Sequence, residues 1–342
     1  MRNSENVLNS LAGHSQDPNY KFERLYRLMY NENLYATAYQ NIAPNTGNCT
    51  KGADGQSIDG MSVKRIHNLI DRLKDESYRP YPAKRVYIPK KNAKKRPIGI
   101  PAFDDKLVQE VIKMVLEAIY EGHFEKCSHG FRPHRSCHTA LASISEGFDG
   151  TRWFIEGDIK GFFDNIDHDV MIGILGERIK DERFLRLIRK FLKAGYLEQW
   201  EFRGTYCGTP QGGVLSPILA NIYLDKLDKY MVEYISSFNI GKARKRNPEY
   251  KRIGSRKDKR VKKLKNKRDR QKIAALRMEI KKLHREMQQH PATLDMDGDF
   301  KRMRYVRYAY AFLIGVIGSK EDCVKAKNNW MSTDWQKPTD NI

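Results

Sequence analysis

Apolar residues recur every three to four positions in several long segments, which is the spacing of an amphipathic helix. In the stretch that follows Asp104 and Asp105, either of which is placed to cap it, leucine, isoleucine and valine side chains form one continuous stripe. Ser216 and Pro217 have the residue types of a helix cap and a first helical position. The predicted helices cover residues 21–40, 61–76, 105–121, 162–194 and 216–234.

Apolar and polar residues alternate in other segments, as they do in half-buried strands. Val86 and Ile88 alternate before a basic turn, and Ile98 and Ile100 alternate after it, so residues 83–101 are predicted to form a β-hairpin. The stretch YVRYAYAFLIG reads as strand, tight turn and strand, and WFIEGD reads as a further strand. Strands mixed with helices indicate an α/β or α+β architecture.

The length of the chain and its apolar content set further bounds. With 342 residues, of which 40% are hydrophobic, it can bury a core and form one large domain or two to three lobes. No run approaches 18 apolar residues, and the first residues lack the apolar region of a signal peptide. We therefore expect no membrane segment and a location inside the cell.

The charge of the chain is strongly positive and concentrated. Its net charge of +21 indicates a polyanionic partner, with nucleic acid ahead of an anionic membrane surface. Residues 242–285 alone hold 21 basic residues and four acidic ones. This region is predicted to be helical, either as a solvated protrusion or as an RNA-binding arm, and the local excess of charge favours the arm. Its narrow apolar seam consists of Ile273, Leu276, Ile280, Leu283 and Met287.

The five cysteines are scattered and form no CxxC pair, which is typical of reduced thiols. Cys127, His129, Cys137 and His138 lie close together in sequence. Their spacing fits no common zinc-binding pattern, so a zinc site there is the weaker interpretation.

One carboxylate is a candidate metal ligand. Asp158 ends a predicted strand, where it can face a cleft, and Mg²⁺ binds one or two carboxylates together with substrate phosphates. The alternative is that Asp158 only caps a turn. Five residues later, Phe163 could form the wall of a sugar pocket, or it could belong to the core.

Two loops have residues suited to a nucleotide. The hairpin tip KKNAKKRP is rich in Lys and Arg, which suit phosphates, although charged tips are often merely solvated. In GTPQGG, residues 208–213, the glycines allow the backbone to approach a ligand, and the Gln211 amide can read a base edge or a sugar. The alternative for this loop is a plain turn before a helix.

The order of the motifs is more specific than any one of them. The motifs occur along the chain in the order basic hairpin, GFRPHRS, EGDIKGFFDNIDHD, GTPQGGVLSPILANIYL and RYVRYAYAFLIG. From about residue 22 to residue 323, the chain closely resembles the reverse transcriptases encoded within group II introns, which also act as maturases. The resemblance implies an α+β fold of the right-hand polymerase type, with fingers and palm.

The resemblance also implies roles for individual residues. Asp158 corresponds to the first metal-binding aspartate, the carbonyl of Ile159 to a second Mg²⁺ ligand, and Phe163 to the residue that excludes a ribose 2′-hydroxyl. Residues that would bind the incoming nucleotide are Lys84, Lys90, Arg96, Pro210 and Gln211. Residues that would contact RNA are Arg132 and, in the basic region, Lys259, Arg260, Lys262, Lys263, Lys265, Lys267 and Arg268.

Two features depart from the family pattern. The family has two aspartates after Tyr-Ala in its catalytic hairpin, and this chain has Tyr310 and Ala311 there. Two-metal phosphoryl transfer needs carboxylates that bridge cations about 3.5–4 Å apart. A tyrosine phenol is neutral at pH 7 and alanine offers no side-chain ligand, so polymerase activity is predicted to be lost. After Cys323 the sequence is polar and without apolar periodicity, so no further helix and no thumb are expected.

These assignments divide the chain. The expected parts are an N-terminal extension and the start of the fingers in residues 1–83, fingers in 84–150, the first part of the palm in 151–238, a basic helical insertion in 239–302, a degenerate catalytic hairpin in 303–318 and a truncated or divergent tail in 319–342.

Three functions fit this sequence. The chain is a disabled copy of an RNA-directed DNA polymerase, an RNA-binding splicing cofactor that needs no metal, or a reverse transcriptase of a retron or defence system. The basic insertion and the long N-terminal region speak against the third. The resemblance implies group II intron RNA as partner, a DNA primer and dNTPs in the intact family, and a cytoplasmic or organellar ribonucleoprotein. Homodimerisation is a further possibility.

Overall fold

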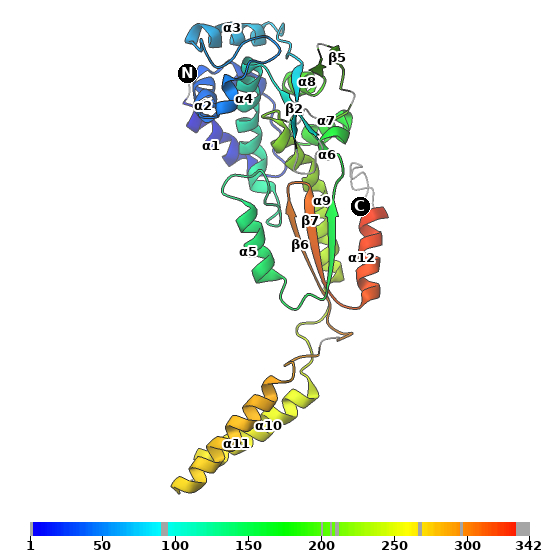
Figure 1. Ribbon diagram of the computed structural model, residues 1–342. Coiled ribbons are helices and arrows are strands. Elements are labelled where there is room, and N and C mark those ends of the chain that lie inside the picture. The colour runs from blue at the N-terminus through cyan, green and yellow to red at the C-terminus, as the bar shows by residue number, and fades with distance from the viewer. Residues whose placement is uncertain are drawn as a thin grey trace.

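A computed structural model gives the arrangement of the chain (Figure 1). It describes residues 3–89, 95–199, 201–205, 207–208, 212–265, 269–294 and 297–332.

Within the described ranges, seven strands form two separate sheets. The predicted β-hairpin at residues 83–101 is confirmed, because β1 and β2 pair antiparallel, with Val86 opposite Ile98. Two short strands that the sequence pattern did not predict extend this sheet, and the order is β2-β1-β4-β5. The second sheet has the order β3-β7-β6. The strands are β1 Ala83–Pro89, β2 Lys95–Ile100, β3 Trp153–Asp158, β4 Tyr196–Glu198, β5 Glu201–Arg203, β6 Arg302–Tyr308 and β7 Ala311–Ile317.

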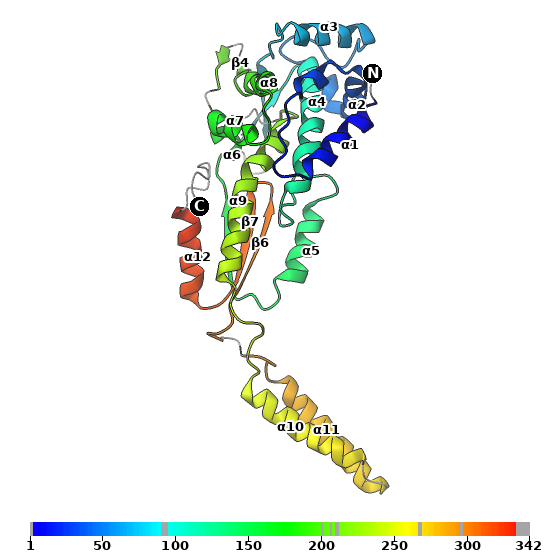
Figure 2. The same cartoon turned by 180° about the vertical axis from the view of Figure 1, so that it is seen from behind.

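Helices pack against the three-stranded sheet and supply most of the buried core residues. The apolar stripe of α4 is almost completely buried, as its sequence pattern predicts, and α9 lies along the three-stranded sheet (Figure 2). The helices are α1 Ser4–Ser15, α2 Glu32–Ile42, α3 Val63–Lys74, α4 Phe103–Tyr120, α5 Cys137–Gly147, α6 Phe162–Asn165, α7 His168–Gly176, α8 Glu182–Leu192, α9 Ser216–Phe238, α10 Pro248–Lys265, α11 Arg270–Gln288 and α12 Lys320–Ser332. Short 3₁₀ turns occur at η1 Tyr26–Tyr30, η2 Thr46–Cys49 and η3 Glu121–His123.

The single helix predicted for residues 21–40 is wrong. Residues 26–30 form the 3₁₀ turn η1, and Asn31 then adopts an extended conformation before α2 begins. The Asn31 side chain accepts a hydrogen bond from the Asn33 backbone N–H at 3.1 Å. Asparagine competes with helix formation by bonding nearby backbone groups, so it starts a new helix here instead of continuing the first.

Two predicted helix caps also differ from the structure. The cap position of α4 is Ala102, and the two predicted cap residues lie in its first turn. There, Asp104 pairs with Arg65 and Asp105 accepts a hydrogen bond from the Tyr81 backbone N–H. At α9 the cap position is Leu215, one residue before the predicted serine. At α4, contacts with distant segments therefore involve the two side chains that the local sequence assigned to a cap.

The segment after Cys323 forms a helix, contrary to the sequence-based expectation. Within α12, Ala326 is buried, and the ring of Trp330 lies 4.7 Å from the ring of Phe312 on β7. Ala326 and Trp330 are four positions apart on one helix face, which makes too narrow a stripe to stand out as a periodic pattern.

The basic region forms two helices that pack side by side and project from the end of the molecule opposite the first sheet (Figure 1). We call α10 and α11 together the basic arm. Ile253 on α10 is buried against Leu283 and Met287 on α11. The predicted seam therefore faces α10, and its other three members are half-buried. No helix within the described ranges is long and apolar enough to cross a membrane.

Candidate functional site: the β3 and β6–β7 turn

The end of strand β3 lies beside the turn of the β6–β7 hairpin. Asp158 pairs with Ala311 across the sheet, and the Ile159 N–H donates a hydrogen bond to the Tyr310 carbonyl at 3.2 Å. The Ile159 carbonyl accepts a hydrogen bond from the Phe162 N–H at 3.2 Å. The family resemblance predicted carboxylates at positions 158, 310 and 311, and these positions are thus adjacent in space. An exposed carboxylate is present at one of them, Asp158.

The turn itself is tight and closely packed. Tyr308 pairs with Ala311, so two residues connect the strands, and the first of them, Ala309, has a left-handed φ of 55°. The backbone of Gly130 approaches this turn so closely that a Cβ there would lie 2.2 Å from the Ala309 nitrogen. A glycine is therefore required in GFRPHRS, because any side chain would push the turn away.

The buried side chain of Arg307 stabilises the turn through hydrogen bonds. The Arg307 guanidinium donates to the Ala309 carbonyl at 2.6 Å, and also to Asp228, Asn221 and the Ser128 hydroxyl. Sequence reasoning missed this cluster. The signal was present, since Asn221 and Asp228 lie seven residues apart on α9, on the helix face that the core buries.

Two aromatic rings cluster with Tyr310 of the turn. The ring of Phe163 lies 5.8 Å from that of Tyr310 and 6.5 Å from that of Phe131, in both cases edge to face. Phe162 beside it is buried in the core, whereas Phe163 is partly buried and Phe131 is half exposed. Of the two phenylalanines, only Phe163 is therefore available to a ligand at this site.

The residues predicted to bind a nucleotide are only partly described. Lys84 is exposed on β1, where it pairs with Ile100. Arg96 lies on β2 opposite Ile88, and its side chain is outside the described residues. Lys90, Pro210 and Gln211 also lie outside them. The nucleotide-binding assignment of these five positions stays a prediction.

The ends of the glycine-rich loop are fixed. Gly208 donates to the Ile166 carbonyl at 2.7 Å and accepts from the His168 ring nitrogen Nε2 at 2.7 Å. Gly212 has a φ of 105°, and a Cβ there would lie 2.5 Å from the Gly99 carbonyl oxygen. Gly208 therefore lies against the α6–α7 connection, and Gly212 lies against strand β2.

The positions predicted to contact RNA fall into two environments. Arg132 is buried, and its guanidinium pairs with Glu121 at 2.8 Å and donates to the Glu125 carbonyl at 2.8 Å, so it braces its own loop and is not presented at the surface. Arg260 pairs with Glu279 at 2.8 Å across the arm. The exposed members are Lys259, Lys262, Lys263 and Lys265, and Lys267 and Arg268 lie outside the described residues.

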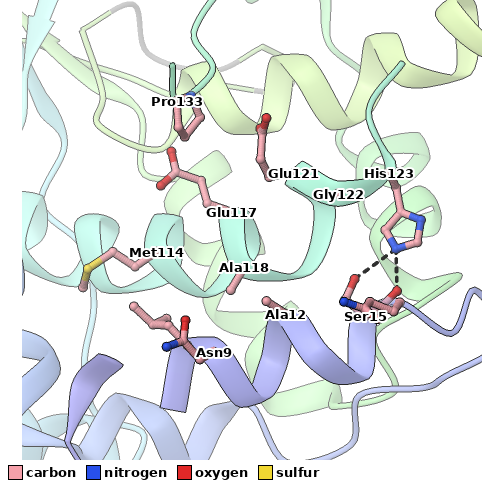
Figure 3. A pocket seen from close by; sticks show the side chains of 12 residues that line it. Asn9, Ala12, Ser15, Met114, Glu117, Ala118, Glu121, Gly122, His123 and Pro133 are labelled. Atoms are coloured by element: carbon pink, nitrogen blue, oxygen red, sulfur yellow. Dashed lines mark hydrogen bonds between the residues drawn. The ribbon is translucent and has the colours of Figure 1, made fainter. Parts of the chain in front are cut away.

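A cavity of about 700 Å³ lies between α1 and the end of α4, and Ser15 and His123 close one side of it (Figure 3). His123 Nε2 is 2.5 Å from the Ser15 carbonyl oxygen, and burial lowers the pKa of this histidine. Glu117 and Glu121 give the cavity an acidic lining, and burial raises the pKa of Glu117. This charge opposes phosphate, so the cavity is unsuited to a nucleic acid backbone.

Comparison with known proteins identifies the family. A family model described as reverse transcriptase (RNA-dependent DNA polymerase) matches residues 88–240. The chain is 48% identical over 306 residues to the group II intron-encoded protein LtrA of Lactococcus lactis subsp. cremoris, a match that covers 88% of this chain and 50% of that protein. This chain belongs to the group II intron-encoded reverse transcriptases.

Two further relatives carry intron functions or locations in their names. The 91 kDa protein in the cob intron of Schizosaccharomyces pombe is 42% identical over 92% of this chain and 39% of that protein. Nuclear intron maturase 1, mitochondrial, of Arabidopsis thaliana is 27% identical over 66% of this chain and 35% of that protein. The chain spans half or less of the length of these curated relatives.

Reverse transcriptases use Mg²⁺, an ion that binds carboxylate oxygens. At the hairpin, Asp158 contributes a carboxylate, and Tyr310 and Ala311 contribute none. Asp164 and Asp167 are exposed, and Asp167 caps α7 by accepting from two backbone N–H groups. Among the described residues, no three His, Cys, Asp or Glu side chains converge on one point, which also leaves the zinc hypothesis without support. The residues present do not fit a pair of Mg²⁺ ions.

Proposed function

We propose that this chain binds folded group II intron RNA and does not extend a DNA primer on it. The absence of primer extension is inferred from the pairing of Asp158 with Ala311 and the hydrogen bond between Ile159 and Tyr310. The two side chains nearest to Asp158 in the sheet and turn therefore lack carboxylates. Phosphoryl transfer by two metal ions needs further carboxylate ligands beside Asp158, and Tyr310 and Ala311 supply none.

The basic arm supports the first half of the proposal. Its exposed lysines stand on a two-helix projection with its own small core, so charge is displayed away from the body of the molecule. RNA phosphates bind such surfaces by releasing counterions, and this needs no metal site. The loss of Asp side chains at the hairpin leaves the arm unaffected.

The relatives support intron RNA as the partner over other RNA. LtrA is named for a group II intron, and the Arabidopsis relative is named an intron maturase. We further assign residues 84–150 to the fingers, residues 151–238 and 303–318 to the palm, and residues 239–302 to an insertion in the palm. The intact family acts on a DNA primer and dNTPs, which this chain would leave unused.

Two measurements on the same preparation test the proposal. Incorporation of labelled dNTPs on a primed RNA template should stay at background in the presence of Mg²⁺, next to an active reverse transcriptase as positive control. Filter binding should give a tighter Kd for a folded group II intron RNA than for an unrelated structured RNA of equal length. Measurable incorporation would favour a working polymerase, and equal affinity for both RNAs would reduce the chain to a non-specific RNA binder.

A further inference from the structure

We infer that Phe131, Phe163 and Tyr310 form a stacking site for an unpaired RNA base that works without a metal ion. The inference rests on the proposed RNA-binding function and names a ligand for the altered hairpin. The three rings come from segments far apart in the sequence, namely the loop before α5, helix α6 and the β6–β7 turn. We call them the aromatic corner.

The geometry of the aromatic corner suits a flat ligand. The planes of Phe163 and Tyr310 meet at 84°, and those of Phe131 and Phe163 meet at 63°. Because neighbouring rings meet at such steep angles, a base can stack flat on one ring while its edge contacts another. Phe131 has 49% of its surface exposed, which leaves the area that a stacked base would cover.

The backbone beneath the rings is held in place before any ligand arrives. Phe131 and Ala309 both have a left-handed φ, of 57° and 55°. The Asn221 amide donates to the Gly130 carbonyl at 2.9 Å, and the His129 N–H donates to the Arg307 carbonyl at 2.9 Å. Residues kept in such uncommon conformations cluster at ligand sites, and a rigid platform loses little entropy on binding.

The local charge favours a base over a free nucleotide. Asp158 is exposed and makes no ion pair within the part of the chain that the structure describes. In the absence of bound cations, its carboxylate repels a triphosphate next to the rings. A base within a single strand has its phosphates on either side, so it can reach the aromatic corner while those phosphates stay outside it.

The test is the binding of a fluorescently labelled eight-nucleotide oligoadenylate in buffer with EDTA, for the whole chain and single variants. Phe131→Ala and Tyr310→Ala should each weaken binding by between about fivefold and a hundredfold, as removal of one stacking ring does. Tyr310→Phe keeps the ring and should stay within about twofold of the parent. Phe202→Ala removes a ring that is 61% exposed on the other sheet and serves as the matched control.

Salt separates stacking from charge. The loss caused by Tyr310→Ala should be the same at low and high salt, because stacking displaces no counterions. Phe131 is half exposed, so its variant should fold normally, which thermal melting verifies. If neither alanine variant weakens oligonucleotide binding while folded intron RNA still binds, the aromatic corner is not a site and the proposed function stands. If the chain binds neither the oligoadenylate nor folded intron RNA, the aromatic corner and the proposed function are both wrong.

Discussion

Arg307 and Asp228 form a fully buried ion pair that joins strand β6 to helix α9. Nε donates to Oδ1 at 2.8 Å and to Oδ2 at 3.1 Å, and Nη2 donates to Oδ2 at 2.6 Å. The remaining guanidinium donors reach Asn221, Ser128 and the Ala309 carbonyl, so every N–H of the arginine has an acceptor. The pair fixes the hairpin turn whether or not that turn carries aspartates.

Removal of one partner should be costly for stability. Asp228→Ala leaves the buried charge of Arg307 without its counterion, and we expect the free energy of unfolding to fall by about 3–5 kcal/mol. The control is Glu177→Ala, which removes the partner of Lys226 on α9 from a solvent-accessible pair and should cost less than about 1 kcal/mol. Urea unfolding followed by circular dichroism measures both, and equal small losses would mean that the buried pair adds little.

A glycine beside the turn offers a second test of this packing. Gly130→Ala places a Cβ against the Ala309 backbone, and we expect it to lower the free energy of unfolding by about 1–3 kcal/mol. Gly173→Ala is the matched control, because nothing lies within 4 Å of a Cβ there. In the interior of α7 it should raise stability by about 0.5–1 kcal/mol. A Gly130→Ala variant as stable as the parent would show that the turn shifts freely.

A buried carboxyl near the first sheet predicts a pH dependence of stability. Burial raises the pKa of Asp105 to about 7, against about 3.9 in an unfolded chain, even though Tyr78 and the Tyr81 N–H donate hydrogen bonds to it. Because the folded value is the higher one, the folded state binds this proton more tightly. Its stabilising contribution is present below about pH 4 and is lost as the pH rises to about 7.

The variant Asp105→Asn isolates this contribution. It should flatten the fall of unfolding free energy between about pH 4 and 7, a fall that amounts to at most about 4 kcal/mol for this group. Asp71→Asn, at a largely exposed carboxylate, should leave the profile of the parent unchanged. Urea unfolding at several pH values gives both profiles. Identical profiles for all three proteins would mean that Asp105 is ionised in the folded state.

Sequence alone predicted the elements whose pattern repeats over many residues. The hairpin at residues 83–101 follows from alternation of apolar residues, and the helices α4, α9 and α11 follow from apolar residues at helical spacing. The placement of Asp158 next to Tyr310 and Ala311 followed from resemblance to a family, since nothing in local spacing brings positions about 150 residues apart together.

Side-chain contacts between distant segments were beyond such reasoning. Arg307 shares a face of β6 with Met303 and Tyr305, but nothing in the local pattern identifies its partner Asp228, which is 79 positions away. Arg132 was predicted to contact RNA from the family resemblance, yet its side chain is buried and hydrogen-bonds to Glu121 and to the Glu125 carbonyl. In both cases the fold determines what the charge does, and the sequence shows only that the charge is there.

The exposed lysines of the basic arm predict how RNA binding depends on salt. Lys259, Lys262 and Lys263 are exposed on α10 and make no ion pair among the residues that the structure describes. Each lysine that contacts a phosphate adds about 0.7–0.9 to the slope of log K against log salt. Replacement of all three by Gln should therefore reduce the slope for folded intron RNA by roughly 2–3. Helix α10 should persist, because Gln and Lys have similar helix propensities.

The same three positions replaced by Arg form the control, because charge is kept while the side chain changes. That variant should retain the salt slope of the parent, as a surface that binds phosphates through charge requires. Kd values from filter binding at four or more salt concentrations give the slopes of the three proteins. If the Gln variant keeps the parent slope, the basic arm is a solvated projection, and the phosphate contacts must come from the body of the protein.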